Sequence, residues 1–204
     1  MVGELPPGSA IAEASLAAQI GISRTPVREV FRRLADEGLL DIRPQVGTFV
    51  APIRLGAVHD SQFVRETLEC RTVRMAVEHA APADDDALQR HLDRQRPLIS
   101  AGDHLAFFPL DEALHAEIIR IAGRQAIWDV IQGAKTQLDR VRYLSFQDQN
   151  WLEMVFAEHQ QIVERILERD ADGAEAVMRQ HLRTVLTAIE RLADERPHFF
   201  ARRR

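Results

Sequence analysis

The sequence predicts a mainly α-helical protein, in which a small amino-terminal unit of helices and two strands precedes an all-α antiparallel helical bundle. Up to residue 54 the expected elements are short and change in type, whereas from Leu55 onward apolar residues recur with the period of a helix. A length of 204 residues is enough for two small domains. We therefore expect one domain at residues 1–54 and a second at residues 55–204.

The composition is ordinary for a soluble globular protein. Cys70 is the single cysteine, so no disulfide can form within the chain, which fits a reducing cytoplasm. No apolar run approaches the roughly 20 residues that span a bilayer. Residues 1–8 lack the basic and then apolar pattern of a signal peptide. We therefore expect a cytoplasmic protein that does not interact with membranes.

Charge is distributed unevenly along the chain. The net charge is −5, which is not what a general nucleic-acid binder shows. Residues 1–54 nevertheless hold six of the 26 basic side chains and six of the 31 acidic ones, so the acidic excess lies wholly in residues 55–204. The basic side chains of the first part include a local cluster of arginines. Such a cluster is enough to contact phosphates, whatever the total charge of the protein.

The two helices expected in the first domain are short and sharply bounded. Residues 15–20 form the first helix, and Gly21 stops it. In the second helix Thr25 can act as the N-cap and Pro26 suits the first helical position, while Gly38 ends the helix. Four apolar residues with helical spacing are expected to face the core: Val27, Val30, Phe31 and Leu34.

The other face of the second helix carries arginines. Arg24, Arg28 and Arg32 follow one another at intervals of four residues and form one exposed stripe. The free N–H groups at the start of the helix suit a phosphate, and the hydroxyls of Ser23 and Thr25 add short-range donors. Because arginine is the usual reader of guanine in the major groove, the pattern favours a DNA-reading helix-turn-helix. The alternative is an ordinary amphipathic helix with a solvated basic face.

Two strands are expected after the second helix. Residues 39–43 and 48–52 have strand-like patterns around a turn at residues 44–47. They would form the wing of a winged helix-turn-helix domain. Gly47 lies at the tip and would let the backbone approach DNA closely, and Thr48 follows it, so we expect both to contact DNA.

The second domain is predicted to consist of six helices. Pro82, Gly123 and the turn at residues 170–173 are among the breaks that separate them. The expected helices are at about 55–81, 84–101, 104–122, 124–146, 150–169 and 171–195.

An aspartate and three histidines are expected inside this bundle. Asp111 and His115 lie one turn apart on the third helix, and His159 and His181 lie among apolar residues of the fifth and sixth helices. Burying an imidazole without a partner costs roughly 1–3 kcal/mol, and shared binding of a metal would remove that cost. One carboxylate and three neutral imidazoles suit Zn²⁺, Ni²⁺, Fe²⁺ or Mn²⁺. The alternative is that each histidine is separately satisfied in the core or at the surface.

The amino-terminal motifs closely resemble those of the GntR family of bacterial regulators. The resemblance rests on Pro7-Gly8, on Gly-Ile-Ser-Arg-Thr-Pro-Val-Arg-Glu at residues 21–29, on Glu-Gly-Leu at residues 37–39, and on Gly47. Members usually carry an extra helix before the Pro-Gly pair, and only six residues precede Pro7, so we expect the first helix to be missing. The resemblance implies DNA contacts by the wing around Gly47 and by Ser23, Arg24, Thr25 and Arg28.

Residues 55–195 resemble the FCD ligand-binding domain of the FadR branch of that family. The family pattern is Asp-x-x-x-His, then a histidine in Glu-His-x-x-Ile, then a histidine near the start of the last helix. Here these are Asp111 to His115, residues 158–162, and His181. Members with all four residues typically bind a divalent metal ion. With six expected helices, the domain is most similar to the VanR-like group.

The resemblance also indicates where an effector would bind. Four protein ligands leave open positions on a five- or six-coordinate metal, and a small carboxylate could fill them. Arg65 matches a family arginine on the first helix of the domain, and Arg142, four residues after Leu138, can also point inward. Either cation would hold a carboxylate by paired hydrogen bonds. The alternative is that both arginines make structural ion pairs.

These observations favour a metabolite-responsive repressor over two alternatives. A homodimer would bind two half-sites of a palindromic DNA operator about one helical turn apart, and a small carboxylate at the metal would modulate that binding. One alternative is a metal-dependent hydrolase or oxygenase, but no separate general base is placed near the cluster, and we do not expect an enzyme. In the other alternative the metal ion is itself the signal.

Overall fold

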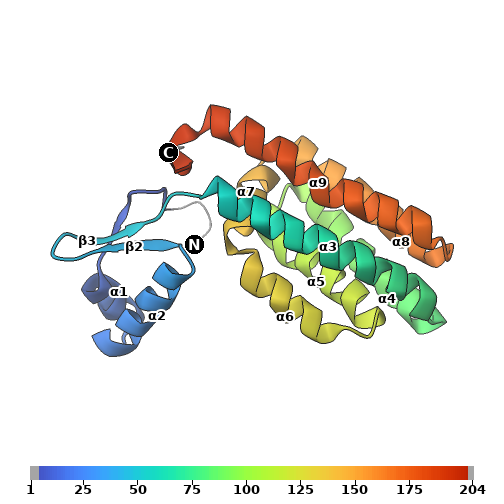
Figure 1. Ribbon diagram of the computed structural model, residues 1–204, viewed down its shortest axis with the longest axis horizontal. Helices are drawn as coiled ribbons and strands as arrows, with labels where there is room; N and C mark the ends of the chain where they lie inside the picture. Colours follow the sequence, from blue (N-terminus) through green and yellow to red (C-terminus); the bar gives the residue numbers. More distant parts are fainter. Residues whose placement is uncertain (1–4, 202–204) are drawn as a thin grey trace.

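The computed structural model describes residues 5–201 and has the two expected parts (Figure 1). In the first part three short strands form an antiparallel sheet in the order β1-β3-β2, with Ala10 opposite Phe49 and Leu40 opposite Val50. The β2–β3 hairpin projects as a wing. A small core joins Ala17, Val27, Phe31 and Leu40. The elements are β1 (Ala10–Ile11), α1 (Glu13–Ile20), α2 (Arg24–Asp36), β2 (Leu40–Arg43) and β3 (Gly47–Val50).

Three details of this domain differ from the sequence-based expectation. Helix α2 begins at Arg24 with Ser23 as its N-cap, so Thr25 lies in the first turn and is not the cap. Val30 is 52% exposed, because α1 and the sheet cover the side of α2 that carries Val27 and Phe31 and leave the Val30 side open. The structure also has a third strand, β1, which the sequence analysis does not predict because two residues are too few to give an alternating pattern.

The second part is a bundle in which α3 lies beside α9 and also packs on α5, α6, α7 and α8. None of the helices described is long and apolar enough to cross a membrane. Within residues 5–201 the bundle consists of α3 (Leu55–His79), α4 (Pro82–Ala101), α5 (His104–Ile121), α6 (Gln125–Ala134), α7 (Thr136–Phe146), α8 (Gln149–Leu167) and α9 (Ala171–Glu195), followed by the short 3-10 helix η1 (Pro197–Phe199).

The described bundle therefore has seven helices where the sequence predicts six. The expected helix at residues 124–146 is two helices, α6 and α7, with a break at Lys135. The ammonium group of Lys135 is buried at this break between the carboxylates of Glu112 and Asp139. This compensation comes from the tertiary structure, so the local sequence pattern does not reveal it. Pro82, expected as a break, is instead the first residue of α4.

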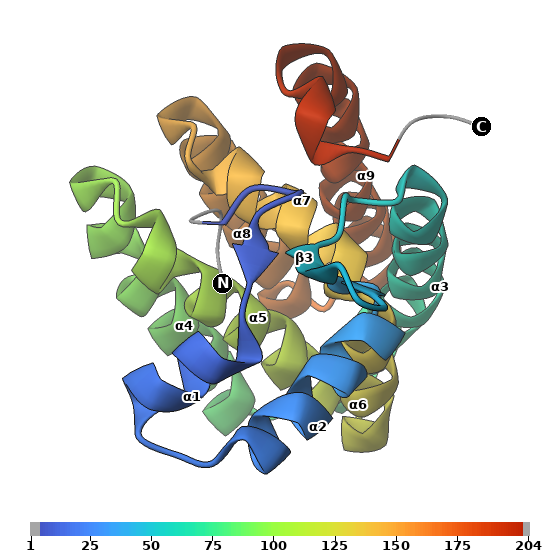
Figure 2. The same ribbon diagram turned by 90° about the vertical axis from the view of Figure 1, so that its left-hand side faces the viewer.

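Helix α7 joins the bundle to the winged domain, which faces the viewer in Figure 2. Gln137 Nε2 donates to the Gly38 carbonyl over 2.9 Å, and Arg140 Nη2 donates to the Ala51 carbonyl over 2.7 Å. The carboxyl-terminal segment adds a backbone contact, in which the Ile53 N–H donates to the Phe199 carbonyl over 2.8 Å. Three segments distant in the sequence therefore meet at this joint between the domains.

Replacing Gly38 with alanine is expected to weaken this joint. Gly38 has a φ of +73°, and a Cβ atom there would lie 2.6 Å from Arg54 Nη2 and 3.2 Å from Gln137 Nε2. The left-handed backbone costs a non-glycine residue roughly 1–2 kcal/mol, so we expect the melting temperature to fall by roughly 2–8 °C. Thermal unfolding followed by circular dichroism measures the change. Gly56→Ala, within α3 and facing open space, is the control and should not lower the melting temperature. Equal melting temperatures for the two variants would contradict this account.

Candidate functional site

The structure brings the four predicted metal ligands together in the core of the bundle. Asp111 and His115 come from α5, His159 from α8 and His181 from α9, and all four are buried. One potential ligand atom from each residue lies within 4.8 Å of the others. His181 Nε2 is 3.2 Å from His115 Nε2, and His159 Nε2 is 3.5 Å from Asp111 Oδ1. Three helices therefore direct one carboxylate and three imidazoles at one point.

An acceptor lies behind the other ring nitrogen of each imidazole: it is hydrogen-bonded to His159 and His181, and it is in close contact with His115 without the geometry of a hydrogen bond. Glu69 on α3 lies 2.5 Å from Nδ1 of His115. Gln95 Oε1 on α4 lies 2.8 Å from Nδ1 of His159, and Glu158 Oε2 lies 2.8 Å from Nδ1 of His181. An acceptor at Nδ1 keeps the proton there and leaves the Nε2 lone pair directed into the cluster. This arrangement is typical of histidines that bind a metal.

Sequence reasoning missed these three outer partners. Glu158 stands directly before His159, and Glu69 lies four residues after Arg65, but neither pattern shows which imidazole the carboxylate faces. Gln95 gives no local signal at all, because its role depends on α4 packing against α8.

The cluster fits a divalent metal ion on the chemistry of its donors. If both Nδ1 atoms carry the proton, facing Glu69 and Glu158, the Nε2 lone pairs of His115 and His181 lie 3.2 Å apart and repel each other unless a cation lies near both. Asp111 Oδ1 and His159 Nε2 are buried and have no hydrogen-bond partner among residues 5–201. Buried polar atoms normally find a partner, and a shared cation would supply one to both. One carboxylate oxygen and three imidazole nitrogens suit Zn²⁺, Ni²⁺, Mn²⁺ or Fe²⁺.

The protonation states also suit a metal. Burial lowers the pKa of His159 well below its ordinary value and lowers the pKa of His181 to about 3, so both rings are neutral near pH 7. Burial alone would raise the pKa of the Asp111 carboxyl, but the Arg142 guanidinium beside it holds that pKa well below its usual range. Neutral imidazole and ionised carboxylate are the forms that bind metal ions.

Both arginines expected at an effector site lie beside the cluster, and both already form buried ion pairs. Arg65 Nε lies 2.6 Å from Glu69 Oε1. Arg142 donates to Asp111 and Glu112, and also to Asp139 over 3.0 Å. Arg65, Asp111, Arg142 and His181 border a cavity of about 20 Å³, which has room for about one water molecule. The ion pairs of the alternative interpretation are therefore present in this conformation.

The predicted DNA-contacting side chains of α2 share an exposed surface. Ser23, Arg24, Thr25, Arg28 and Arg32 are all exposed. Arg28 Nε lies 3.1 Å from Glu13 Oε2, but the Arg28 side chain remains 57% exposed. An ion pair this exposed contributes little, so DNA can displace it.

The two wing residues differ from each other. Gly47 is exposed at the start of β3, as expected. Thr48 is only 9% exposed, because successive residues of a strand point to opposite faces and Thr48 faces inward. The Thr48 side chain is therefore less accessible than Gly47, and its contact with DNA stays a prediction. Arg43 on β2 is not among the predicted DNA contacts. Its side chain is exposed, and its guanidinium carbon lies 4.8 Å from the centre of the Phe49 ring.

Two family models match the two parts of the chain. The model of the gntR family of bacterial regulatory proteins matches residues 1–50, and the model of the FCD domain matches residues 60–184. The chain belongs to the GntR family and carries an FCD domain. It is a transcription regulator and not an enzyme, so we reject the alternative of a hydrolase or oxygenase. GntR regulators bind DNA operators and typically dimerise. The exact boundary between the two domains, expected between residues 54 and 55, stays a prediction.

Known proteins similar to this GntR regulator cover most of its length. The HTH-type transcriptional repressor RspR of Escherichia coli K12 is 34% identical over 195 residues, which are 96% of this chain and 86% of that protein. An uncharacterised HTH-type regulator of Streptomyces ambofaciens is 38% identical over 200 residues, covering 97% and 83%. The solved structure of E. coli McbR/YncC has 20% identity and a TM-score of 0.78, covering 93% and 90%, which shows the shared fold.

Proposed function

We propose that this GntR regulator is a cytoplasmic repressor that binds a palindromic operator as a homodimer and responds to a small carboxylate at a metal centre in its FCD domain. The main support for this proposal is that four buried side chains meet at one point in the bundle and that an acceptor lies behind each imidazole. These side chains are Asp111, His115, His159 and His181. Repression is supported by the names of relatives, since RspR is a repressor and a Paenarthrobacter nicotinovorans relative, 26% identical, is a probable repressor of a D-xylose utilisation operon.

The DNA-binding surface in this proposal is the start of α2 together with the tip of the wing. Arg24 and Arg28 would read base edges in the major groove, and Arg32 would contact a phosphate further along the helix. Ser23 and Thr25 would donate to the backbone of the DNA, and Gly47 would bring the wing close to it. All of these residues are exposed on the winged domain.

The metal centre would be held by Asp111, His115, His159 and His181. When bound, the metal ion supplies a positive charge to which a carboxylate oxygen of the effector can bind. Arg65 and Arg142 are the cations placed to orient that carboxylate, by exchanging part of their pairing with Glu69 and with Asp111 for the effector. Both side chains border the small cavity beside the cluster.

Helix α7 provides a physical connection from this site to the DNA-binding domain. Arg142 on α7 contacts Asp111, and five residues earlier on the same helix Gln137 donates to the Gly38 carbonyl of the winged domain. A ligand that changes the pairing of Arg142 would therefore bias the position of α7, and with it the placement of the winged domain. The size of this effect is limited by the difference in the ligand's affinity for the two arrangements.

A second candidate function is that the metal ion is itself the signal. The observation that favours it is the small cavity, since about 20 Å³ leaves little space for an organic molecule in this conformation. In that case metal binding alone would change the affinity for DNA.

Gel-shift titration of the DNA upstream of the regulator's own gene tests the proposal. The protein is compared after treatment with a chelator, after loading with Zn²⁺ or Ni²⁺, and after loading followed by a panel of small carboxylates. We expect specific binding, and a change of at least about fivefold in affinity when a carboxylate is added to the loaded protein. A change caused by the metal alone would favour the second candidate. No specific binding at low salt under any condition would reject both.

A further inference from the structure

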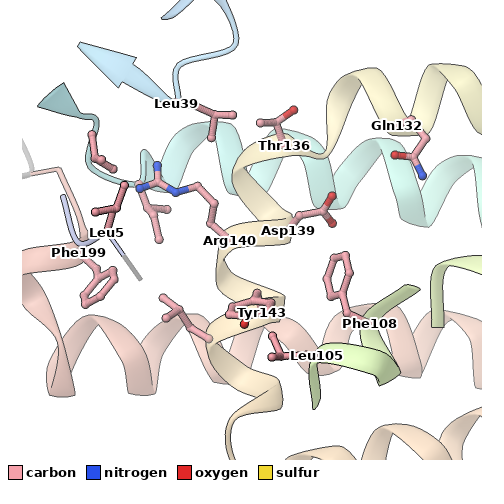
Figure 3. Close-up of a pocket in the computed structure, with 13 residues that line it drawn as sticks. Leu5, Leu39, Leu105, Phe108, Gln132, Thr136, Asp139, Arg140, Tyr143 and Phe199 are labelled. Atoms are coloured by element: carbon pink, nitrogen blue, oxygen red, sulfur yellow. The ribbon is translucent and has the colours of Figure 1, made fainter. Parts of the chain in front are cut away.

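A second, larger cavity lies where the winged domain meets the helical bundle (Figure 3). Its volume is about 390 Å³, within the usual range of small-molecule sites. Leu39 and Val50 line it from the winged domain, and Leu105, Phe108 and Tyr143 line it from α5 and α7. A molecule bound here would therefore touch both domains at once. The metal cluster does not contribute to its lining.

One cation, Arg140, points into this cavity from α7. Its guanidinium donates to the Ala51 carbonyl over 2.7 Å and to Gln137 Oε1 over 3.4 Å. Within residues 5–201 it has no carboxylate partner, whereas Arg65 and Arg142 in the same bundle are each paired with buried acids. Burial lowers the pKa of Arg140 to about 10, so it stays charged near pH 7. A half-buried charge without a counter-ion is a costly feature, and such features gather at functional sites.

The other residues that line the cavity indicate what kind of ligand would fit beside Arg140. The other charged lining residue, Asp139, already pairs with Lys135 and Arg142, and in Figure 3 it points away from Arg140. The remaining surface is predominantly apolar and extends from Leu105 and Phe108 to Phe199. The cavity therefore offers one cationic group and an apolar wall, which together match an anion with an apolar body.

We propose that this interdomain cavity binds an amphipathic monocarboxylate, such as a medium-chain fatty acid, with its carboxylate on Arg140 and its apolar part against Leu105 and Phe108. Unoccupied N–H groups of the guanidinium would donate to the carboxylate while Nη2 keeps its bond to Ala51. Because the ligand spans both domains, it holds them in the present arrangement. The site is distinct from the metal centre and does not depend on it.

Isothermal titration of the full-length protein with octanoate tests the proposal. We expect saturable binding of one octanoate per chain, and Arg140→Gln is expected to weaken it about tenfold or more. Leu105→Trp, at an exposed rim position, should weaken it by filling the cavity. Octanol, which lacks the charge, should bind the wild-type protein and Arg140→Gln equally. Arg33→Gln, a change at an exposed arginine outside the cavity, is the matched control and should bind octanoate as the wild-type protein does.

Three outcomes would overturn the inference. They are absence of saturable octanoate binding, binding that neither Arg140→Gln nor Leu105→Trp reduces, and binding that is lost in a folded His159→Ala variant. The last outcome would assign the ligand to the metal centre. Circular dichroism establishes that each variant is folded, and Leu105→Trp provides an independent reading if Arg140→Gln does not fold. Because the readout is direct binding, failure here is distinguishable from failure of the proposed response at the operator.

Discussion

Replacing His159 with alanine is expected to abolish metal-dependent stabilisation of this regulator. His159 is fully buried, and its Nε2 is one of the cluster atoms without a partner among residues 5–201. Loss of an outer partner of a metal ligand typically costs 10- to 100-fold in affinity, so loss of the ligand itself should cost more than about 100-fold. Metal at about 100 times its Kd would stabilise the wild-type protein by about 2.7 kcal/mol, which corresponds to roughly 5–11 °C in melting temperature. The variant should show no such rise when Zn²⁺ or Ni²⁺ is added.

The matched control is His59→Ala, which removes an exposed histidine of α3 and should leave the metal-dependent rise intact. Alanine at position 159 also leaves a cavity, so the comparison is between each protein with and without metal, and not between variants. If His159→Ala does not fold, His181→Gln tests the same cluster from α9. A wild-type protein whose melting temperature does not respond to any of the four candidate metals would contradict the proposed centre.

The ligands of this centre could be predicted from the sequence because each has a pattern within its own helix, whereas the partners behind them lie on other helices and have no such pattern. Asp111 and His115 share one helical face, and His159 and His181 are flanked by buried residues such as Val155 and Leu182, so periodicity alone placed all four inside the bundle. The outer partners Glu69 and Gln95 lie on other helices. Their distance from the imidazoles is set by helix packing, which a single sequence does not contain.

The same limit explains the break at Lys135 and the role of Arg140. A lysine in a continuous helical pattern predicts an exposed side chain, yet Lys135 is 2% exposed because Glu112 and Asp139 neutralise it. Periodicity places Arg142 inside the bundle, but it says nothing of Arg140, whose surroundings come from the winged domain packed on α7. Elements with a local cause, such as the stop of α1 at Gly21, were predicted correctly.

Replacing Arg24 or Arg28 with alanine is expected to weaken binding to the specific operator while leaving the fold intact. Both side chains are exposed near the start of α2, and within residues 5–201 Arg24 makes no ion pair that would hold it away from DNA. Loss of a bidentate contact with guanine costs roughly 1–3 kcal/mol, so each change should raise the Kd about 5- to 150-fold. Fluorescence anisotropy with labelled operator DNA, repeated with base-substituted operators and at several salt concentrations, measures the effect.

The type of contact follows from the pattern of these losses. A base-reading arginine relaxes the preference for one base pair when it is removed, whereas a phosphate-binding one weakens all sequences alike and lowers the salt dependence by about one unit. Arg33→Ala is the matched control, because Arg33 lies on the same helix with its side chain 83% exposed but about 180° around the axis from Arg24. It should bind within about twofold of the wild-type protein. If Arg24→Ala and Arg28→Ala behaved like Arg33→Ala, the exposed stripe of α2 would be a solvated surface, and DNA would have to be read by another part of the winged domain.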